Sequence, residues 1–152
     1  MMDKVPVPTL SICLTCRDGR EAVHGDLRGG ARLAEAICDL VVRQGCDVHL
    51  RGVRCMSQCK RSCVVSLTAP ASFTYVFGDL DPKMPDHAQA IRDLIPIYRS
   101  APEGFLVRDA RPAPLRASIL GHLPPLYTSS DLVIDLRSEP DADKTCLSAW
   151  NM

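Results

Sequence analysis

Residues 49–67 read HLRGVRCMSQCKRSCVVSL and place a cysteine-rich loop between two apolar runs. The first run alternates apolar and polar side chains as far as Val53, which predicts a half-buried strand with a candidate bulge at Gly52. The second run, Val64–Leu67, predicts another strand. The loop between the two strands carries three cysteines, which are Cys55, Cys59 and Cys63.

The chain before this stretch predicts a strand, a loop and a helix. Thr9–Cys13 is a short apolar run that ends at the sequence CLTCRDGR, where Asp18 and Gly19 indicate a turn. Residues 17–30 are polar and contain glycine, so we expect a surface loop. A helix is predicted from Gly30 to a stop at Gly45. Its apolar face is formed by Leu33, Ile37, Leu40 and Val41.

The chain after the cysteine loop predicts a hairpin and a second helix. A turn at residues 69–72 separates the strand above from the run SFTYVFGDL, residues 72–80, which predicts an antiparallel partner. Asp81 and Pro82 resemble a helix cap followed by proline at the first helical position. Pro96 is expected to kink or end this helix. Its apolar face is formed by Ala88, Ile91, Leu94, Ile95 and Tyr98.

This order of elements predicts an α/β fold of the thioredoxin-like kind: strand–helix–strand, then a β-hairpin, then a closing helix. We expect that domain to cover residues 9–100. Residues 101–152 are punctuated by proline and predict an irregular C-terminal extension. Within it, Leu115–Leu120 is a short helical candidate, residues 130–136 are a candidate edge strand, and the polar tail is expected to be mobile.

Composition narrows the class of protein. Lysine plus arginine equals aspartate plus glutamate at 18 each in 152 residues, so the balanced charge does not favour nucleic acid or an anionic membrane as a partner. The apolar N-terminus is broken by Pro6 and Pro8 and does not resemble a secretion signal, and no run of 18 apolar residues is present. We therefore expect a cytoplasmic protein, in which clustered cysteines bind metal or perform redox chemistry.

The eight cysteines are the outlying feature, and five of them fall into two groups. Each group follows a predicted strand. If these strands are parallel neighbours joined by a right-handed crossover, both loops leave the same edge of the sheet, and five thiols converge there. The first group is Cys13 and Cys16; the second is Cys55, Cys59 and Cys63.

Thiolates at this density suit zinc, Cu(I) or an iron–sulfur cluster. Two loops supply the four ligands that a tetrahedral zinc site or a [2Fe–2S] cluster requires, and the spacing does not choose between the two. A zinc ribbon would more usually repeat the Cys-x-x-Cys spacing, so the wider second group leans slightly against zinc. Three basic residues lie inside or beside the cysteine loops, namely Arg17, Lys60 and Arg61. They either offset the negative charge of the thiolates or are solvated loop residues.

The remaining cysteines and histidines have simpler interpretations. Cys38 lies near the apolar face of the first helix and is expected in the core. Cys46 and Cys146 have no partner at ligand spacing. The four histidines, His24, His49, His87 and His122, are expected to be loop, surface or boundary residues. No nucleophile–base pair, phosphate-binding loop or acid pair is evident, so we expect a protein that is not an enzyme.

Four motifs carry a resemblance to known families, over roughly residues 9–126. They are CLTCR (residues 13–17), CMSQCKRSC (55–63), TYVFGDL (74–80) and RPAPLR (111–116). The second cysteine group followed by a hairpin resembles the thioredoxin-like [2Fe–2S] ferredoxins. All four motifs together resemble, more closely, a family of uncharacterised predicted metal-binding proteins often encoded near cobalamin-biosynthesis genes.

The resemblance implies a function and a ligand set. Cys13 and Cys16 would bind one iron of a [2Fe–2S] cluster and Cys55 and Cys59 the other, with Cys63 as an alternative ligand, a spare or a thiol packed beneath the cluster. Cys63 stands where the ferredoxins have proline, and the first pair is more closely spaced than theirs. Such a protein would pass single electrons to or from a partner oxidoreductase, in cobalamin biosynthesis if the genomic neighbours are a guide. A homodimer is a further expectation.

Two other functions remain open. One is a zinc-binding interaction or metal-delivery protein. The other is a thiol–disulfide oxidoreductase using Cys13 and Cys16. In thioredoxin the active cysteines open a helix, whose N-terminus lowers the pKa of the nucleophile. Here the predicted helix begins only at Gly30, which disfavours this enzyme.

Overall fold

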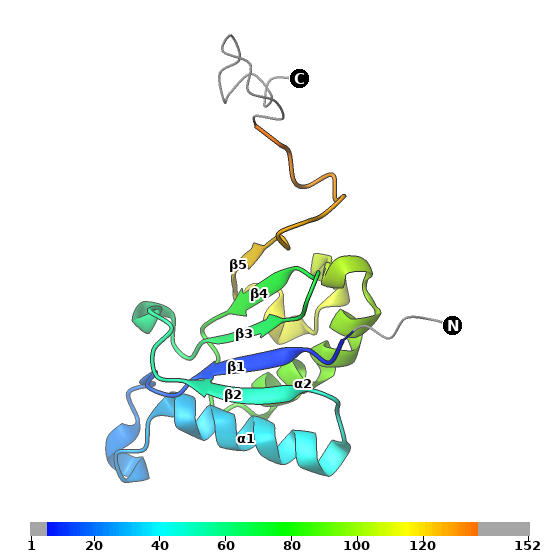
Figure 1. Cartoon of the computed structure of the whole chain (residues 1–152). Helices are drawn as coiled ribbons and strands as arrows, with labels where there is room; N and C mark the ends of the chain where they lie inside the picture. Colours follow the sequence, from blue (N-terminus) through cyan, green and yellow to red (C-terminus); the bar gives the residue numbers. More distant parts are fainter. Residues whose placement is uncertain (1–5, 137–152) are drawn as a thin grey trace.

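The computed structural model describes residues 6–136 as a five-stranded sheet with two α-helices packed on one of its faces (Figure 1). The strands are β1 (Thr9–Cys13), β2 (His49–Val53), β3 (Val65–Thr68), β4 (Thr74–Phe77) and β5 (Ile119–Leu123). The α-helices are α1 (Gly29–Gln44) and α2 (Pro85–Ser100). Five 3₁₀ turns complete the order: η1 (Glu21–His24), η2 (Cys59–Arg61), η3 (Pro102–Gly104), η4 (Arg108–Ala110) and η5 (Ala113–Leu115).

The strand order across the sheet is β2-β1-β3-β4-β5. β1 and β2 are parallel and joined through α1, whereas β3, β4 and β5 each pair antiparallel with the preceding neighbour in that order. A parallel strand–helix–strand unit, an antiparallel hairpin and a closing helix make up the thioredoxin-like arrangement. The predicted α/β fold class is confirmed.

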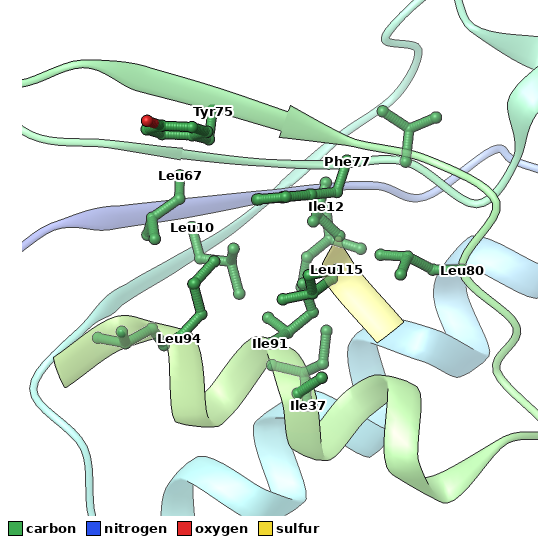
Figure 2. Close-up of a cluster of buried hydrophobic side chains, with 14 of the residues drawn as sticks. Leu10, Ile12, Ile37, Leu67, Tyr75, Phe77, Leu80, Ile91, Leu94 and Leu115 are labelled. Carbon is green, nitrogen blue, oxygen red and sulfur yellow. The ribbon is translucent and has the colours of Figure 1, made fainter. Parts of the chain in front are cut away.

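The core lies between the sheet and the two helices (Figure 2). Alternate residues of each strand point into it, because successive side chains of a strand project to opposite faces. The most deeply buried large side chains include Leu10, Ile12, Ile37, Leu67, Tyr75, Phe77, Leu80, Ile91 and Leu94. None of the helices in residues 6–136 is both long and apolar enough to cross a bilayer.

The first helix follows its prediction closely. α1 buries Leu33 and Ile37 on its apolar face and ends at Gly45, whose φ of 70° suits glycine. The predicted bulge at Gly52 is wrong, because the β1–β2 register runs without interruption from Thr9 to Cys13. Gly52 is instead small because a Cβ there would lie 2.3 Å from the side chain of Leu14.

The predicted start of the second helix is wrong, and of the two outcomes predicted for Pro96, a kink or an end, the end does not occur. α2 begins at Pro85, with Met84 as the cap residue, and not after Asp81. Pro85 takes the first helical position, where its missing N–H costs nothing. The helix also continues through Pro96 to Ser100, because residues on both sides of the proline, Ile95 and Tyr98 among them, are buried in the core.

The region after α2 differs most from expectation. Residues 115–120 do not form a helix: η5 ends at Leu115, and β5 begins at Ile119 and pairs with β4. β5 is thus the extra edge strand, and residues 130–136 form none. Leu106 and Leu115 are buried in the core. The division at residue 100 stays a prediction, and the polar tail from residue 137, with Cys146, lies outside the described residues.

Candidate metal centre

The parallel pairing of β1 and β2 brings the two cysteine loops together. Cys13 is level with Val53 in the register, so both strands end at the same edge of the sheet. Beyond the strands, the backbone N–H of Leu14 donates to the carbonyl of Val53 at 2.8 Å. The hydroxyl of Thr15 donates to the carbonyl of Arg54. The predicted common edge is confirmed, and hydrogen bonds join the two loops there.

Three of the five thiols at this edge are buried. Cys13, Cys16 and Cys63 are 3%, 4% and 0% exposed, although Cys63 comes from the other loop. The sulfur of Cys13 lies 3.8 Å from the hydroxyl of Thr15, and Cys16 is close enough to Cys13 and Cys63 to interact electrostatically with both. The sequence could not reveal this grouping, because it depends on the turn that follows η2.

The three buried thiols differ in acidity. Burial raises the pKa of Cys16 to about 12, and its thiol also donates to the sulfur of Cys13. Burial raises the pKa of Cys63 to about 12 as well, with a contribution from the negative charge of Asp18. Burial also disfavours the Cys13 thiolate, but hydrogen bonds from Cys16, Thr15 and the backbone of Met56 outweigh it and lower the pKa of Cys13. Cys13 therefore has the lowest pKa of the three buried thiols.

The other two predicted ligands are on the surface. Cys55 and Cys59 are exposed, and the N–H of Ser57 donates to the sulfur of Cys55 at 3.3 Å. Within residues 6–136, no three cysteine, histidine, aspartate or glutamate side chains converge in a ligating geometry. The structure therefore brings Cys13, Cys16 and Cys63 together and leaves Cys55 and Cys59 in an adjacent exposed loop.

The cysteines and histidines away from the loops fall mostly where expected. Cys38 is the exception: it is exposed on α1, and its prediction as a core residue is wrong, because the buried stripe of the helix is narrower than the periodicity suggested. Cys46 is half-buried between α1 and β2. His24 and His49 are exposed, and His87 accepts a hydrogen bond from the N–H of Asp81.

The start of α1 supports the first cysteine loop. The N–H of Gly30 donates to the carbonyl of Cys16 at 2.9 Å. A Cβ at Gly30 would lie 1.8 Å from the carbonyl oxygen of Cys13 and 3.3 Å from the Cβ of Cys16. Only glycine allows this approach. The N-terminus of α1 therefore lies against the cysteines even though the helix begins well after Cys16 in the sequence.

The FGDL motif supports the second cysteine loop. The carboxylate of Asp79 accepts two hydrogen bonds from Nε of Arg61 at 2.8 and 3.0 Å, and the N–H of Asp79 donates to the carbonyl of Arg61. Cys63 and Leu80 exchange backbone hydrogen bonds at 3.0 and 3.2 Å. A Cβ at Gly78 would lie 2.6 Å from the carbonyl oxygen of Arg61. The chain leaves β4 at Phe77 and turns here, with Asp79 at a φ of 55°.

A network of ion pairs, not predicted from the sequence, connects the start of α1 with the FGDL motif. Asp18 is bonded by Arg20 and Arg32, and Arg20 also forms a two-point pair with Asp81 at 2.7 and 3.1 Å. Burial opposes ionisation of Asp18, but its hydrogen bonds from Arg32 and from the backbone of Arg20 prevail and lower its pKa to about 2. Glu21 accepts from the N–H of Gly29 at 3.1 Å and so caps α1. The alternating charges of residues 17–21 are the feature of the sequence from which this network could be inferred.

The donor chemistry of this edge fits a soft metal. The carboxylates near the cysteines, Asp18, Asp79 and Asp81, are all paired with arginines, which leaves the thiols as the available donors. Thiolate ligands select zinc, Cu(I) or iron–sulfur clusters. Cys13, Cys16 and Cys63 are buried close enough together to interact electrostatically. Five thiols at one edge exceed the four that such a site needs.

Comparison with known proteins places the chain in a family. No curated protein matches it. Among solved structures, the chain is similar to a thioredoxin-like [2Fe–2S] ferredoxin from Aquifex aeolicus, with 15% sequence identity and a TM-score of 0.42 over 66% of this chain and 98% of that one. Residues 10–125 match the family described as "Protein of unknown function (DUF1636)", and the chain belongs to that family.

Proposed function

We propose that this protein is a one-electron carrier that holds a [2Fe–2S] cluster at the cysteine edge of its sheet. The observation that carries the proposal is the parallel pairing of β1 and β2, which places the loop of Cys13 and Cys16 beside the loop of Cys55 and Cys59. These four residues are the proposed ligands. When bound, the cluster would supply one-electron chemistry, which needs no substrate pocket.

The two halves of the proposed site contribute differently. Cys13 and Cys16 are buried and held by Gly30, so they form the fixed half. Cys55 and Cys59 belong to an exposed loop, which would have to close over the fixed pair to complete the ligand set. The contact of the sulfur of Cys13 with the hydroxyl of Thr15, at 3.8 Å, is of the kind that tunes a reduction potential.

The exposed loop is also the proposed route for electrons. A cluster beneath residues 55–61 would lie close to the surface, where a partner oxidoreductase can approach. We further propose that the protein itself is not an enzyme and that its partner belongs to cobalamin biosynthesis. The pathway rests only on the resemblance of the four motifs, and identifying the partner tests it directly.

One observation favours a second candidate function, thiol–disulfide exchange. Cys13 has a lowered pKa and contacts Cys16, and the N-terminus of α1 lies against the pair. Both cysteines are nearly inaccessible, however, and a disulfide substrate must reach the attacking sulfur. A zinc-binding interaction or delivery protein, the third candidate, would use the same thiols.

Anaerobic purification followed by visible spectroscopy and iron, sulfide and zinc analysis tests these functions. A brown protein with about two irons and two sulfides per chain supports the carrier. Colourless protein with one zinc, which gains no colour on reconstitution with iron and sulfide, would refute it. Rapid reduction of a protein disulfide by colourless, metal-free protein would favour exchange. Cys38→Ser is the matched control, because Cys38 is an exposed cysteine on α1 that is not one of the proposed ligands.

A further inference from the structure

The exposed apolar side chains are concentrated at one end of the described chain. Of thirteen large apolar residues exposed within residues 6–136, seven lie between Leu123 and Leu136. Leu126 and Tyr127 are 87% and 85% exposed. Residues 124–136, here called the C-terminal arm, extend away from the sheet beyond β5 (Figure 1). The apolar residues form two exposed groups, residues 126–127 and 132–136, on either side of the polar residues 128–131. Exposed apolar groups of this kind indicate a surface that another protein covers.

The strand that precedes the arm has a free edge. β5 is the last strand in the order, so its outer edge has no strand partner within the described residues. Natural proteins protect such edges with charges or proline, because unpaired N–H and C=O groups invite pairing with another chain. The opposite edge strand, β2, exposes His49 and Arg51. β5 reads ILGHL, contains no lysine, arginine or proline, and exposes Leu123.

We propose that two copies of this chain associate by antiparallel pairing of their β5 edges, and that the C-terminal arm of each copy lies along the other. A free strand edge is self-complementary in an antiparallel two-fold arrangement, so one surface serves both copies. The arm leaves the molecule across this same edge (Figure 1), on the side where the second copy would lie. Pairing and arm exchange therefore bury the free edge and the exposed apolar groups together.

The direction of β5 decides where each arm goes. Ile119, the first residue of β5, pairs with Phe77, which pairs with Val65, which in turn pairs with Ile12, so β5 begins at the cysteine edge and ends at the opposite one. Antiparallel pairing sets Leu123 of one copy beside Ile119 of the other. Each arm would thus start at the cysteine edge of the other copy.

The length and charge of the arm suit this position. Thr128 donates to the carboxylate of Glu103 in its own copy at 2.6 Å, so the segment left to cross is residues 129–136. Extended, these eight residues reach roughly 27 Å, whereas the four strand spacings from β5 of one copy to β1 of the other amount to about 19 Å. The arm carries two acidic residues, Asp131 and Asp135. The cysteine edge exposes Arg17, Arg54 and Lys60, besides Arg61, which is already paired with Asp79. Opposite charges therefore meet where the arm of one copy crosses the cysteine loops of the other.

Gly121 allows a direct test of the strand pairing. It is the central residue of β5, so the two copies would place it next to the two-fold axis. A Cβ at Gly121 meets nothing within 4 Å, so a side chain there does not disturb the fold. Sedimentation equilibrium of the full chain should show a dimer for the wild type and for Gly121→Asn. Gly121→Asp, which sets two carboxylates against each other, should weaken association at least tenfold.

Arm exchange is tested separately with a photocrosslinking residue at Leu132, which is exposed and does not support the core. Light and heavy-isotope copies are mixed before irradiation. Crosslinks that join light to heavy chains at residues 54–61 support exchange, whereas crosslinks confined to one chain overturn it. A wild type that stays monomeric at 100-fold rising concentrations, or a dimer that Gly121→Asp leaves intact, overturns the pairing. These measurements do not depend on which metal the thiols bind, so they can fail independently of the proposed cluster.

Discussion

Gly30 is the residue on which the geometry of the cysteine edge depends most directly. Its missing side chain lets the backbone of α1 lie against the carbonyl of Cys13, at a distance no real Cβ contact tolerates. The same helix N-terminus donates a hydrogen bond to the carbonyl of Cys16. Displacing α1 here would therefore move both thiols of the fixed half of the proposed site.

Gly30→Ala should lower the free energy of unfolding by about 1–3 kcal/mol, because the new methyl group forces a backbone shift in a packed region. Urea denaturation followed by circular dichroism measures the change. Gly121→Ala is the control, since its Cβ would meet no atom within 4 Å and should change stability by less than about 1 kcal/mol. Equal stability of the two variants would contradict the close approach at Gly30.

The five cysteines of the two loops should separate into two classes on replacement by serine. Cys55→Ser and Cys59→Ser should abolish the visible absorbance of the purified protein. They should change the free energy of unfolding of metal-free protein by less than about 0.5 kcal/mol, because both residues are exposed. Cys63→Ser should only weaken the absorbance. It should destabilise metal-free protein by about 1–3 kcal/mol, because it buries a hydroxyl in the core.

Spectra and urea denaturation of the same variants provide the two measurements. Cys13→Ser and Cys16→Ser should lose both absorbance and stability, since these residues are proposed ligands and are buried. Full retention of the absorbance in Cys55→Ser would exclude it as a ligand and point to Cys63 in its place.

At the scale of elements, the cysteine loops are held by neighbours rather than by regular structure of their own. The loop of residues 55–63 contains only the short turn η2. Its attachment comes from the FGDL turn after β4, through the Arg61–Asp79 pair and the backbone bonds between Cys63 and Leu80. Two motifs that the sequence shows separately are thus one structural unit.

Asp79→Asn should loosen this loop without much effect on global stability. The Arg61–Asp79 pair is half exposed, and surface ion pairs contribute only about 0–1 kcal/mol. Amide hydrogen exchange of residues 59–62 should nevertheless become several-fold faster, because the loop loses its side-chain anchor. Asp39→Asn, which removes the exposed pair with Arg43 on α1, should leave these amides unchanged. Unchanged exchange in Asp79→Asn would show that the backbone bonds alone hold the loop.

At the scale of the whole molecule, two buried tyrosines link stability to alkaline pH. Burial raises the pKa of Tyr98 to about 12, and burial raises the pKa of Tyr75 as well. The neutral phenol is thus favoured in the folded state. This contribution is fully present below the pKa of about 10 that tyrosine has in the unfolded chain, and it is lost as pH rises from 10 towards 12.

Unfolding in urea at pH 8, 10 and 11 should show stability falling above pH 10, with Tyr98 contributing about 1.4 kcal/mol of the loss at pH 11. Tyr98→Phe should be less stable at pH 8, because it lacks the hydroxyl that donates to the carbonyl of Phe73, but its stability should fall less steeply with pH. A wild type and variant with parallel pH profiles would refute the assignment to Tyr98.

Much of the fold follows from local patterns in the sequence. The period-two and helical periodicities of residues 9–80 predict four strands and a helix close to their observed positions, and the strand order then follows from the right-handed crossover. The prolines misled the prediction of α2, because a proline reports only the local backbone preference. Whether a helix continues past Pro96 depends on how deeply Ile95 and Tyr98 are buried.

The choice of the fifth strand also lay beyond local pattern. Residues 130–136 have the stronger strand signal, yet residues 119–123 pair with β4. Residues 101–118, which contain η3, η4 and η5, lead from α2 back to the sheet, and Leu106 and Leu115 within them are buried in the core. This path places residues 119–123 along the free edge of β4. Only one segment can pair with the outer edge of β4, and the residue pattern within a segment does not show which other segments can reach that edge.

Local sequence patterns predict that each of two groups of cysteines follows a strand, and that parallel pairing of those strands would bring both groups to one edge. Long-range packing sets which of these thiols are buried: Cys13, Cys16 and Cys63 are buried together, while Cys55 and Cys59 lie exposed. The two differ in how far apart along the chain the interacting residues lie. Strand and helix signals arise from side chains a few residues apart, whereas the burial of a thiol depends on segments such as Gly30 and Leu80, which the fold alone brings against it.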